Sequence, residues 1–241
     1  MMQSVVKEWW HEFTQDKKSF YFTLALLVTA ASFGGWKGYG LYVERREEAA
    51  QLAMSEALDE YYKALDAAVL NEQSQEIIEQ ILDDARIAFE TFFSRNSGSY
   101  LVPYARALDA DIAWYAGNKD RALDLIQQAI NSTSVLRMRD MFRTKYALML
   151  IDAGKIQEGL DLLRKMIQQY KSDDVKPNGH HYENHVVDYA AYYLGYYYWV
   201  QGDVVAAREA WKMLESFASE NRPEGRSPWL DAAQAKLDLI S

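Results

Sequence analysis

The chain has 241 residues, enough for a membrane anchor and one substantial domain. Apolar residues make up 49% and only four prolines occur, a composition that favours a packed, helix-rich core over disorder. The net charge is -9, and residues 50–241 carry the whole excess, which opposes binding to nucleic acid phosphates. There is no cysteine, so disulfides, thiol catalysis and cysteine metal sites are excluded.

An uncharged stretch between Lys18 and Lys37 predicts a membrane-spanning helix. Eighteen helical residues would extend about 27 Å, close to the thickness of a bilayer's hydrocarbon core. Aromatic residues that favour the membrane interface lie near its two ends: Phe20, Tyr21, Trp36 and Tyr39. We therefore expect a juxtamembrane segment over 1–19, a transmembrane helix over 20–40 and a soluble domain over 44–241.

Two alternatives to an uncleaved anchor are a cleaved signal peptide and a buried soluble helix. The acidic residues Glu8, Glu12 and Asp16 are atypical of the positively charged start of a signal peptide. Orientation is not decided by charge, because three Lys or Arg residues flank each side of the predicted span.

The soluble region begins with two predicted amphipathic helices. Glu44 to Leu70 contains no Pro or Gly, and its apolar residues recur at helical spacing. These residues are Met54, Leu58, Tyr61, Leu65 and Val69. A second helix is predicted from about Gln75 to Phe93, and Ser97-Gly98-Ser99 ends that pattern.

A repeat follows, marked by glycines 117, 154 and 202, each of which separates two helical patterns. Small residues recur before and after each glycine (Ala110, Ala147 and Gly195; Ala122, Gly159 and Ala207), and large apolar ones follow (Ile126, Leu163 and Trp211). This pattern predicts an all-α fold, a transmembrane helix followed by a short right-handed solenoid of tetratricopeptide-like helix pairs. The longer second interval predicts an insertion loop at about Lys171 to Tyr182. Ser227-Pro228 predicts the capped start of a closing helix that reaches Ile240.

Together, the anchor ending in Gly-Trp-Lys-Gly-Tyr (residues 35–39), the long emerging helix, the irregular repeats and the closing helix resemble the YfgM-like family. Members of that family are ancillary subunits of the bacterial SecYEG translocon. The resemblance implies a single-pass inner-membrane protein whose soluble domain faces the periplasm or cell exterior. It also implies protein partners: the translocon, a membrane-anchored chaperone or a client polypeptide.

Candidate partner-binding residues come from the positions that line the concave groove of such arrays. They are Tyr104, Asp111, Tyr115, Met141, Leu148, Tyr189, Tyr192, Tyr196 and Trp199. Tyr and Trp combine rigid contact area with a polar tip, the chemistry enriched at binding hot spots. The alternative is that the emerging or the closing helix folds over the rings of residues 189–199 and makes them core.

Other chemistry is not expected. His181 and His185 are four residues apart, a spacing that can suit a metal, but a polar loop explains them better, so no metal or cofactor is predicted. The catalytic motifs GxSxG and HExxH and a phosphate-binding glycine loop are absent, which indicates a protein that is not an enzyme. The leading hypothesis is a membrane-tethered protein-binding module without a small-molecule substrate. The second is a structural accessory subunit of a large membrane complex without transient clients.

Overall fold

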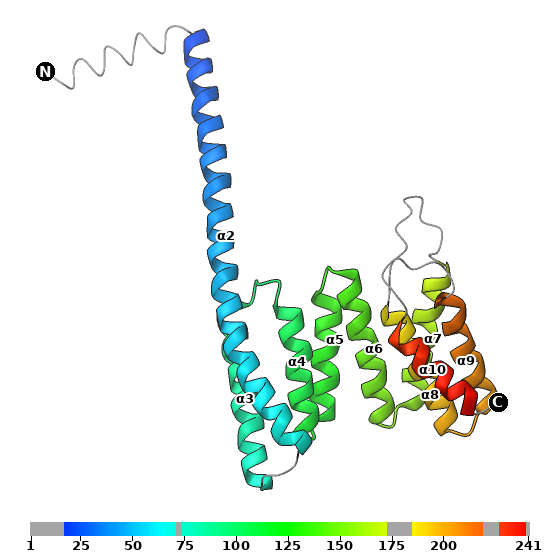
Figure 1. The fold of residues 1–241 in the computed structure, drawn as a ribbon. Helices are drawn as coiled ribbons and strands as arrows, with labels where there is room; N and C mark the ends of the chain where they lie inside the picture. Colours follow the sequence, from blue (N-terminus) through cyan, green and yellow to red (C-terminus); the bar gives the residue numbers. More distant parts are fainter. Residues whose placement is uncertain (1–16, 71–73, 173–184, 219–226, 240–241) are drawn as a thin grey trace, which may run out of the picture. The chain divides into compact units, whose positions relative to one another are not determined.

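A computed structural model describes residues 17–70, 74–172, 185–218 and 227–239 (Figure 1). They form helices and short connections, and no strand occurs among them, which confirms the all-α prediction for this part of the chain. The helices are α2 (Lys17–Leu70), α3 (Gln75–Asn96), α4 (Val102–Tyr115), α5 (Lys119–Ser132), α6 (Leu136–Asp152), α7 (Ile156–Ser172), α8 (His185–Val200), α9 (Val204–Ala218) and α10 (Pro228–Leu239). The chain divides into two compact units, residues 1–52 and residues 53–241.

In the first unit, residues 17–52 are helical and belong to α2. The predicted juxtamembrane segment, residues 1–19, lies almost wholly outside the described residues. Among the residues whose side chains the structure describes, no helix is long and apolar enough to cross a membrane. Most of the predicted span lies outside those residues, because side chains are described only from Trp36 onward. The membrane anchor therefore stays a prediction from the sequence.

The second unit is built from helix pairs: α4 with α5, α6 with α7, and α8 with α9 (Figure 1). The turn glycines Gly117, Gly154 and Gly202 have φ values of 79°, 88° and 83°, a left-handed conformation that is costly for other residues. Each turn also has the same pair of backbone hydrogen bonds. In the first pair, Gly117 N donates to Trp114 O and Asn118 N to Ala113 O. This is the Schellman ending of a helix, and it confirms the predicted turns.

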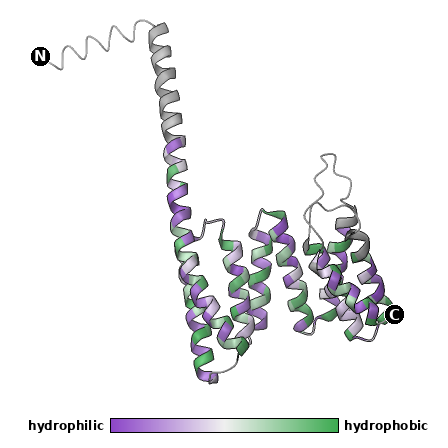
Figure 2. Cartoon of the chain, viewed as in Figure 1, coloured by the Kyte–Doolittle hydropathy of each residue, from purple (hydrophilic) through white to green (hydrophobic). Residues whose placement is uncertain are grey.

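Small and large residues fit together between paired helices. All the small positions predicted on either side of the glycines are buried, as are Ile126, Leu163 and Trp211. A Cβ atom on Gly195 would lie 2.4 Å from Trp211 Nε1, so only glycine lets α9 place its tryptophan there. The same argument applies to Gly159, where a Cβ would lie 2.5 Å from the Ala147 carbonyl oxygen. Each helix accordingly shows both hydrophobic and hydrophilic residues (Figure 2).

At the start of the second unit, the predicted helix from Gln75 is confirmed, and it runs to Asn96 rather than Phe93. The predicted apolar stripe of the preceding helix is confirmed at Met54, which is buried, and is wrong at Val69. Val69 is 60% exposed, whereas Ala57, Ala64 and Ala67 are buried. Small side chains allow close helix approach, and they leave larger residues such as Tyr61 at the margin, where its ring lies 6.4 Å from that of Phe89.

The last helix, α10, packs against α8 and α9, as predicted for a helix that covers the final repeat. It begins at Pro228, and the Leu230 amide donates to the Ser227 carbonyl oxygen. The predicted side-chain cap is wrong, because Ser227 Oγ is buried and has no hydrogen-bond partner among the described residues. The predicted insertion loop starts later than expected, because α7 continues to Ser172; residues 173–184, with most of the histidine cluster, lie outside the described part.

Candidate protein-binding surface

Three helices contribute side chains to one polar and aromatic surface, which we call the α4–α6 face. It consists of Tyr61 from α2, Tyr104, Asp111 and Tyr115 from α4, and Met141 and Lys145 from α6. The carboxylate of Asp111 joins the three helices. Its Oδ2 atom accepts a hydrogen bond from Lys145 Nζ at 2.6 Å and from Tyr61 Oη at 3.2 Å. Lys145 Nζ also donates to the Ala107 carbonyl oxygen at 2.7 Å, which fixes its position against α4.

Helical spacing explains why these residues share a face. On α4, Tyr104, Asp111 and Tyr115 are separated by seven and four residues, so they follow one stripe of the helix. On α6, Lys145 follows Met141 by four residues and lies on the same stripe. The sequence therefore sets which residues align on each helix, while the hydrogen bonds to Asp111 from α2 and α6 connect the stripes.

The pKa of the Tyr61 hydroxyl responds to three neighbouring side chains, those of Asp111, Tyr115 and Tyr104. Burial raises the pKa of the Tyr61 hydroxyl above its ordinary value, and the negative charge of Asp111 and its hydrogen bond raise it further. Tyr115 and Tyr104 contribute smaller effects in the same direction. Tyr104 and Tyr115 nevertheless remain open to solvent, with 37% and 44% of their surface exposed, and Met141 is 50% exposed. The α4–α6 face thus combines a fixed charge with accessible contact area.

The predicted groove residues of α8 form a different arrangement, the α8 aromatic cluster. The Trp229 ring of α10 lies 4.7 Å from that of Tyr189, 5.3 Å from Tyr192 and 5.9 Å from Tyr193. Nearer the end of α8, the centre of the Trp199 ring lies 4.5 Å from Nζ of Lys236, a residue of α10. All of these rings are partly buried. Tyr192, Trp199 and Trp229 pack against the core that α6 to α10 share. The closing helix therefore covers this cluster, which is the alternative left open by the sequence.

Eight of the nine predicted site residues thus fall into two groups. Tyr104, Asp111, Tyr115 and Met141 lie on the α4–α6 face, and Tyr189, Tyr192, Tyr196 and Trp199 belong to the α8 aromatic cluster. Leu148 is a partly buried residue packed against the α6–α10 core. Whether either group binds a partner stays a prediction.

Sequence reasoning missed Tyr61 and Lys145. The sequence pattern places Tyr61 on the apolar stripe of its helix. Its hydroxyl group, however, usually needs a hydrogen-bond partner when the ring is buried. Lys145 is not among the predicted site residues, and a lysine on a repeat helix is usually solvated. Its spacing from Met141 was the signal that could have placed it on the same face.

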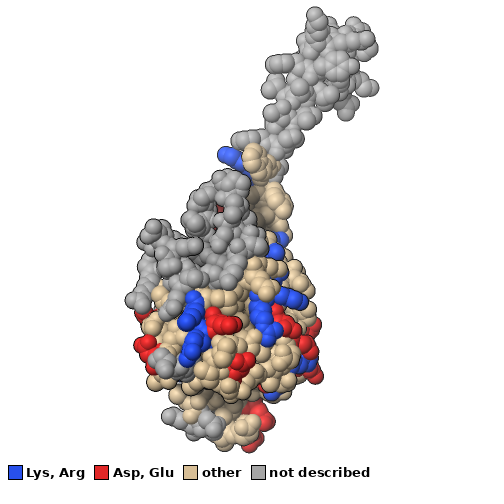
Figure 3. All heavy atoms as spheres, turned by 90° about the vertical axis from the view of Figure 1, so that its right-hand side faces the viewer, with Lys and Arg blue, Asp and Glu red and all other residues tan. Residues whose placement is uncertain are grey.

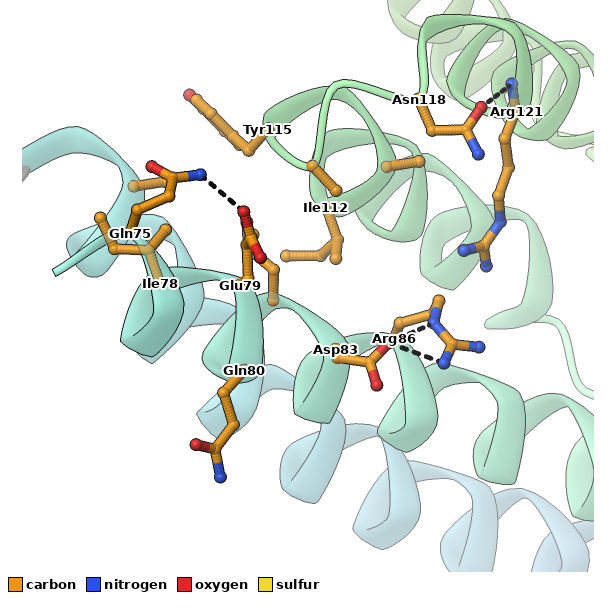
Figure 4. A pocket seen from close by; sticks show the side chains of 14 residues that line it. Gln75, Ile78, Glu79, Gln80, Asp83, Arg86, Ile112, Tyr115, Asn118 and Arg121 are labelled. Atoms are coloured by element: carbon orange, nitrogen blue, oxygen red, sulfur yellow. Dashed lines mark hydrogen bonds and ion pairs between the residues drawn. The ribbon is translucent and has the colours of Figure 1, made fainter.

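An open pocket of about 780 Å³ lies between α3, the end of α4 and the start of α5 (Figure 4). Its lining mixes polar and apolar side chains, and several of the polar ones form hydrogen bonds with each other. Arg86 donates to Asp83 at 2.7 Å, and Gln75 donates to Glu79 at 3.0 Å. These internal pairs occupy the groups that would otherwise attract a charged ligand, so the pocket is a weaker candidate than the α4–α6 face.

Next to this pocket, a buried ion pair joins α4 to α5. Asp109 is 1% exposed, and its carboxylate accepts two hydrogen bonds from Arg121 Nη2, at 3.0 and 3.3 Å. Burial raises the pKa of Asp109 to about 6, although Arg121 opposes the shift. Among the described residues, no group of three or more His, Cys, Asp or Glu side chains could hold a metal ion.

No protein-family model matches the sequence, and no curated protein is similar to it in sequence. Two solved structures are similar in fold, both of kinesin light chain TPR-like repeats from Podosopora anserina, one of them a substituted variant. Both have a TM-score of 0.50 and cover 77% of this chain and 85% of the other, at 15% and 17% identity. The chain therefore has a tetratricopeptide-like fold. Neither structure represents the translocon-subunit family, so that resemblance remains an expectation from the sequence.

Proposed function

We propose that the chain is a membrane-tethered protein-binding module, with no catalytic activity, whose α4–α6 face contacts another protein. The observation that carries the proposal is the exposure of Tyr104, Tyr115 and Met141 around the fixed carboxylate of Asp111. Rigid aromatic side chains and methionine are enriched at protein interfaces, and stacked helix pairs present extended binding surfaces. The tetratricopeptide-like fold supports this kind of role.

The finer features of the proposal rest on the sequence. The uncharged stretch between Lys18 and Lys37 supports a tether in the membrane. The resemblance to ancillary translocon subunits supports a place in the bacterial inner membrane, with the repeats outside the cytoplasm. It also supports partners among translocon components, membrane-anchored chaperones and exported polypeptides.

Site-specific photo-crosslinking in cells tests the binding surface. A photoreactive phenylalanine analogue replaces Tyr104, Tyr115 or Met141 in turn, and the matched control carries it at Ile87 of α3, which is also exposed (48%). We expect cross-linked protein adducts from the three positions of the α4–α6 face and weaker or no adducts from Ile87. Equal adducts from all four positions, or none from the α4–α6 face, would contradict the proposed surface.

Two further experiments test the tether and its direction. Deletion of residues 20–36 should move the protein from the membrane fraction to the soluble fraction, and a deleted form that still sediments with membranes would contradict an anchor. Because the sequence has no cysteine, a single Gln127→Cys substitution at an exposed position of α5 gives an unambiguous label site. We expect a membrane-impermeant thiol reagent to label it in intact spheroplasts, whereas a cytoplasmic domain would be labelled only after lysis.

A further inference from the structure

We propose that Asp111 is a recognition site for a basic side chain, lysine or arginine, on an extended segment of the partner protein. The inference deepens the proposed function and rests on it, since it names the chemistry that the α4–α6 face selects. Its basis is the arrangement around the Asp111 carboxylate, in which one oxygen is occupied and the other is available.

The two hydrogen bonds to Asp111 converge on a single oxygen. Lys145 Nζ and Tyr61 Oη both donate to Oδ2, and Oδ1 receives no hydrogen bond from the described residues. An ionised carboxylate can accept hydrogen bonds at both oxygens, so Oδ1 has unused capacity. The Asp111 side chain retains 22% of its exposure, which lets a cation reach it while the surroundings limit screening by water.

The neighbouring side chains suit the rest of a basic residue. Tyr104 and Tyr115 lie on either side of Asp111 along α4, and tyrosine rings attract ammonium and guanidinium groups. Met141 adds an exposed, flexible apolar surface on α6, which can pack against the methylene stem of a lysine or arginine. A neutral or acidic residue would use only part of this arrangement.

The charge of the repeat unit also favours a basic partner segment. Residues 50–241 carry the entire net charge of -9, so an approaching acidic segment is repelled overall. On the face shown in Figure 3, acidic and basic residues are interspersed and do not form a patch of one sign. On the α4–α6 face, the positioned carboxylate of Asp111 is the group that can recognise a positive charge. Lys145 already neutralises part of its charge, so the internal lysine and the partner's basic residue compete for the same carboxylate.

Because of this competition, removing Asp111 and removing Lys145 should change the affinity for a basic peptide in opposite directions. The full-length protein, purified in detergent, is titrated at low salt with a fluorescent eight-residue peptide of Gly, Ser and Leu that contains one arginine. The matched probe carries norleucine at that position. We expect the arginine peptide to bind about tenfold more tightly, with a difference that shrinks as salt is added. Asp111→Asn should abolish the difference, whereas Lys145→Met should increase it severalfold because the carboxylate loses its internal partner.

Asp124→Asn on α5 is the control, since it removes one exposed carboxylate of the same charge away from this face. Thermal unfolding of each variant reports stability separately. The inference is overturned if Asp111→Asn preserves the arginine preference, if Lys145→Met weakens arginine binding in parallel with Asp111→Asn, or if neither peptide binds. Equal binding of both peptides would overturn basic selectivity alone, whereas a lack of cross-links from Tyr104 and Tyr115 would overturn the proposed function itself.

Discussion

The α4–α6 face and the α8 aromatic cluster use the same positions of the repeat but have different environments. On α4, Tyr104 and Tyr115 are more than one third exposed and surround a charged pair. On α8, Tyr189 and Tyr192 lie beneath Trp229 of the closing helix. A tyrosine at a groove position is therefore a contact for a partner or part of the core, depending on whether another helix covers it. Four experiments sharpen this difference.

The largest expected effect is on the α8 side. Trp211 is fully buried, donates its indole N–H to the Tyr192 carbonyl oxygen at 3.0 Å and fills the space above Gly195. Trp211→Ala should lower the free energy of unfolding by about 3–5 kcal/mol, because it leaves a cavity. Urea unfolding measures this, with Lys212→Ala as the exposed neighbour that should change stability by less than about 0.5 kcal/mol. A loss below about 1 kcal/mol would contradict the packing described.

On α4, the buried Asp109 should make the free energy of unfolding depend on pH. The pKa of Asp109 is about 6 in the fold and 3.8 ordinarily, so the folded state binds the proton more tightly. Its contribution to stability is fully present below about pH 4 and is lost as the pH rises through about 6, a change of about 2–3 kcal/mol. Asp109→Asn should remove this component, which the difference between wild-type and variant unfolding curves from pH 4 to 7 isolates. An unchanged pH profile would contradict the assignment.

Removal of the covering ring should have an intermediate effect. Trp229→Ala should cost about 2 kcal/mol, less than a fully buried tryptophan because Trp229 keeps some exposure. Near-ultraviolet circular dichroism should also change, since three tyrosine rings lose the ring that they contact. The exposed Val205→Ala on α9 serves as the control. If stability and the aromatic spectrum both stay unchanged, α10 does not cover the cluster in solution.

The smallest effect on stability belongs to the α4–α6 face. Tyr104→Ser combined with Tyr115→Ser should alter the free energy of unfolding by about 1 kcal/mol or less, because both side chains are exposed. The same double variant should reduce cross-linking from the analogue at position 141. A loss of several kcal/mol would show that these rings are core, like those of α8, and would remove the contrast between the two regions.

Much of the fold could be predicted because it depends on local features. The turn glycines, the small residues at the helix contacts and the large residue after each turn are all visible as a periodic pattern, and the structure places them as expected. The helix bounds of α3 and α10 were predicted to within a few residues. The side-chain cap at Ser227 was predicted from its place before Pro228, but a cap also depends on rotamer and surroundings, which sequence does not supply.

The candidate site was less predictable, because it combines residues distant in sequence. Tyr61 meets Asp111 across 50 positions, and Lys145 meets it across 34. Helical spacing alone could assign Tyr104, Asp111 and Tyr115 to one stripe. It could not indicate that a lysine from α6 and a tyrosine from α2 would converge on one carboxylate oxygen.

By itself, the sequence determined the helical repeat, because helical periodicity and glycine turns are properties of neighbouring residues. It also supplies the case for a membrane anchor, which rests on an uncharged stretch of chain. Only the tertiary structure decided which groove positions remain open. The long-range packing of α10 on α8 partly buries one set of aromatic rings, whereas the hydrogen bonds between α2, α4 and α6 leave another set exposed around Asp111.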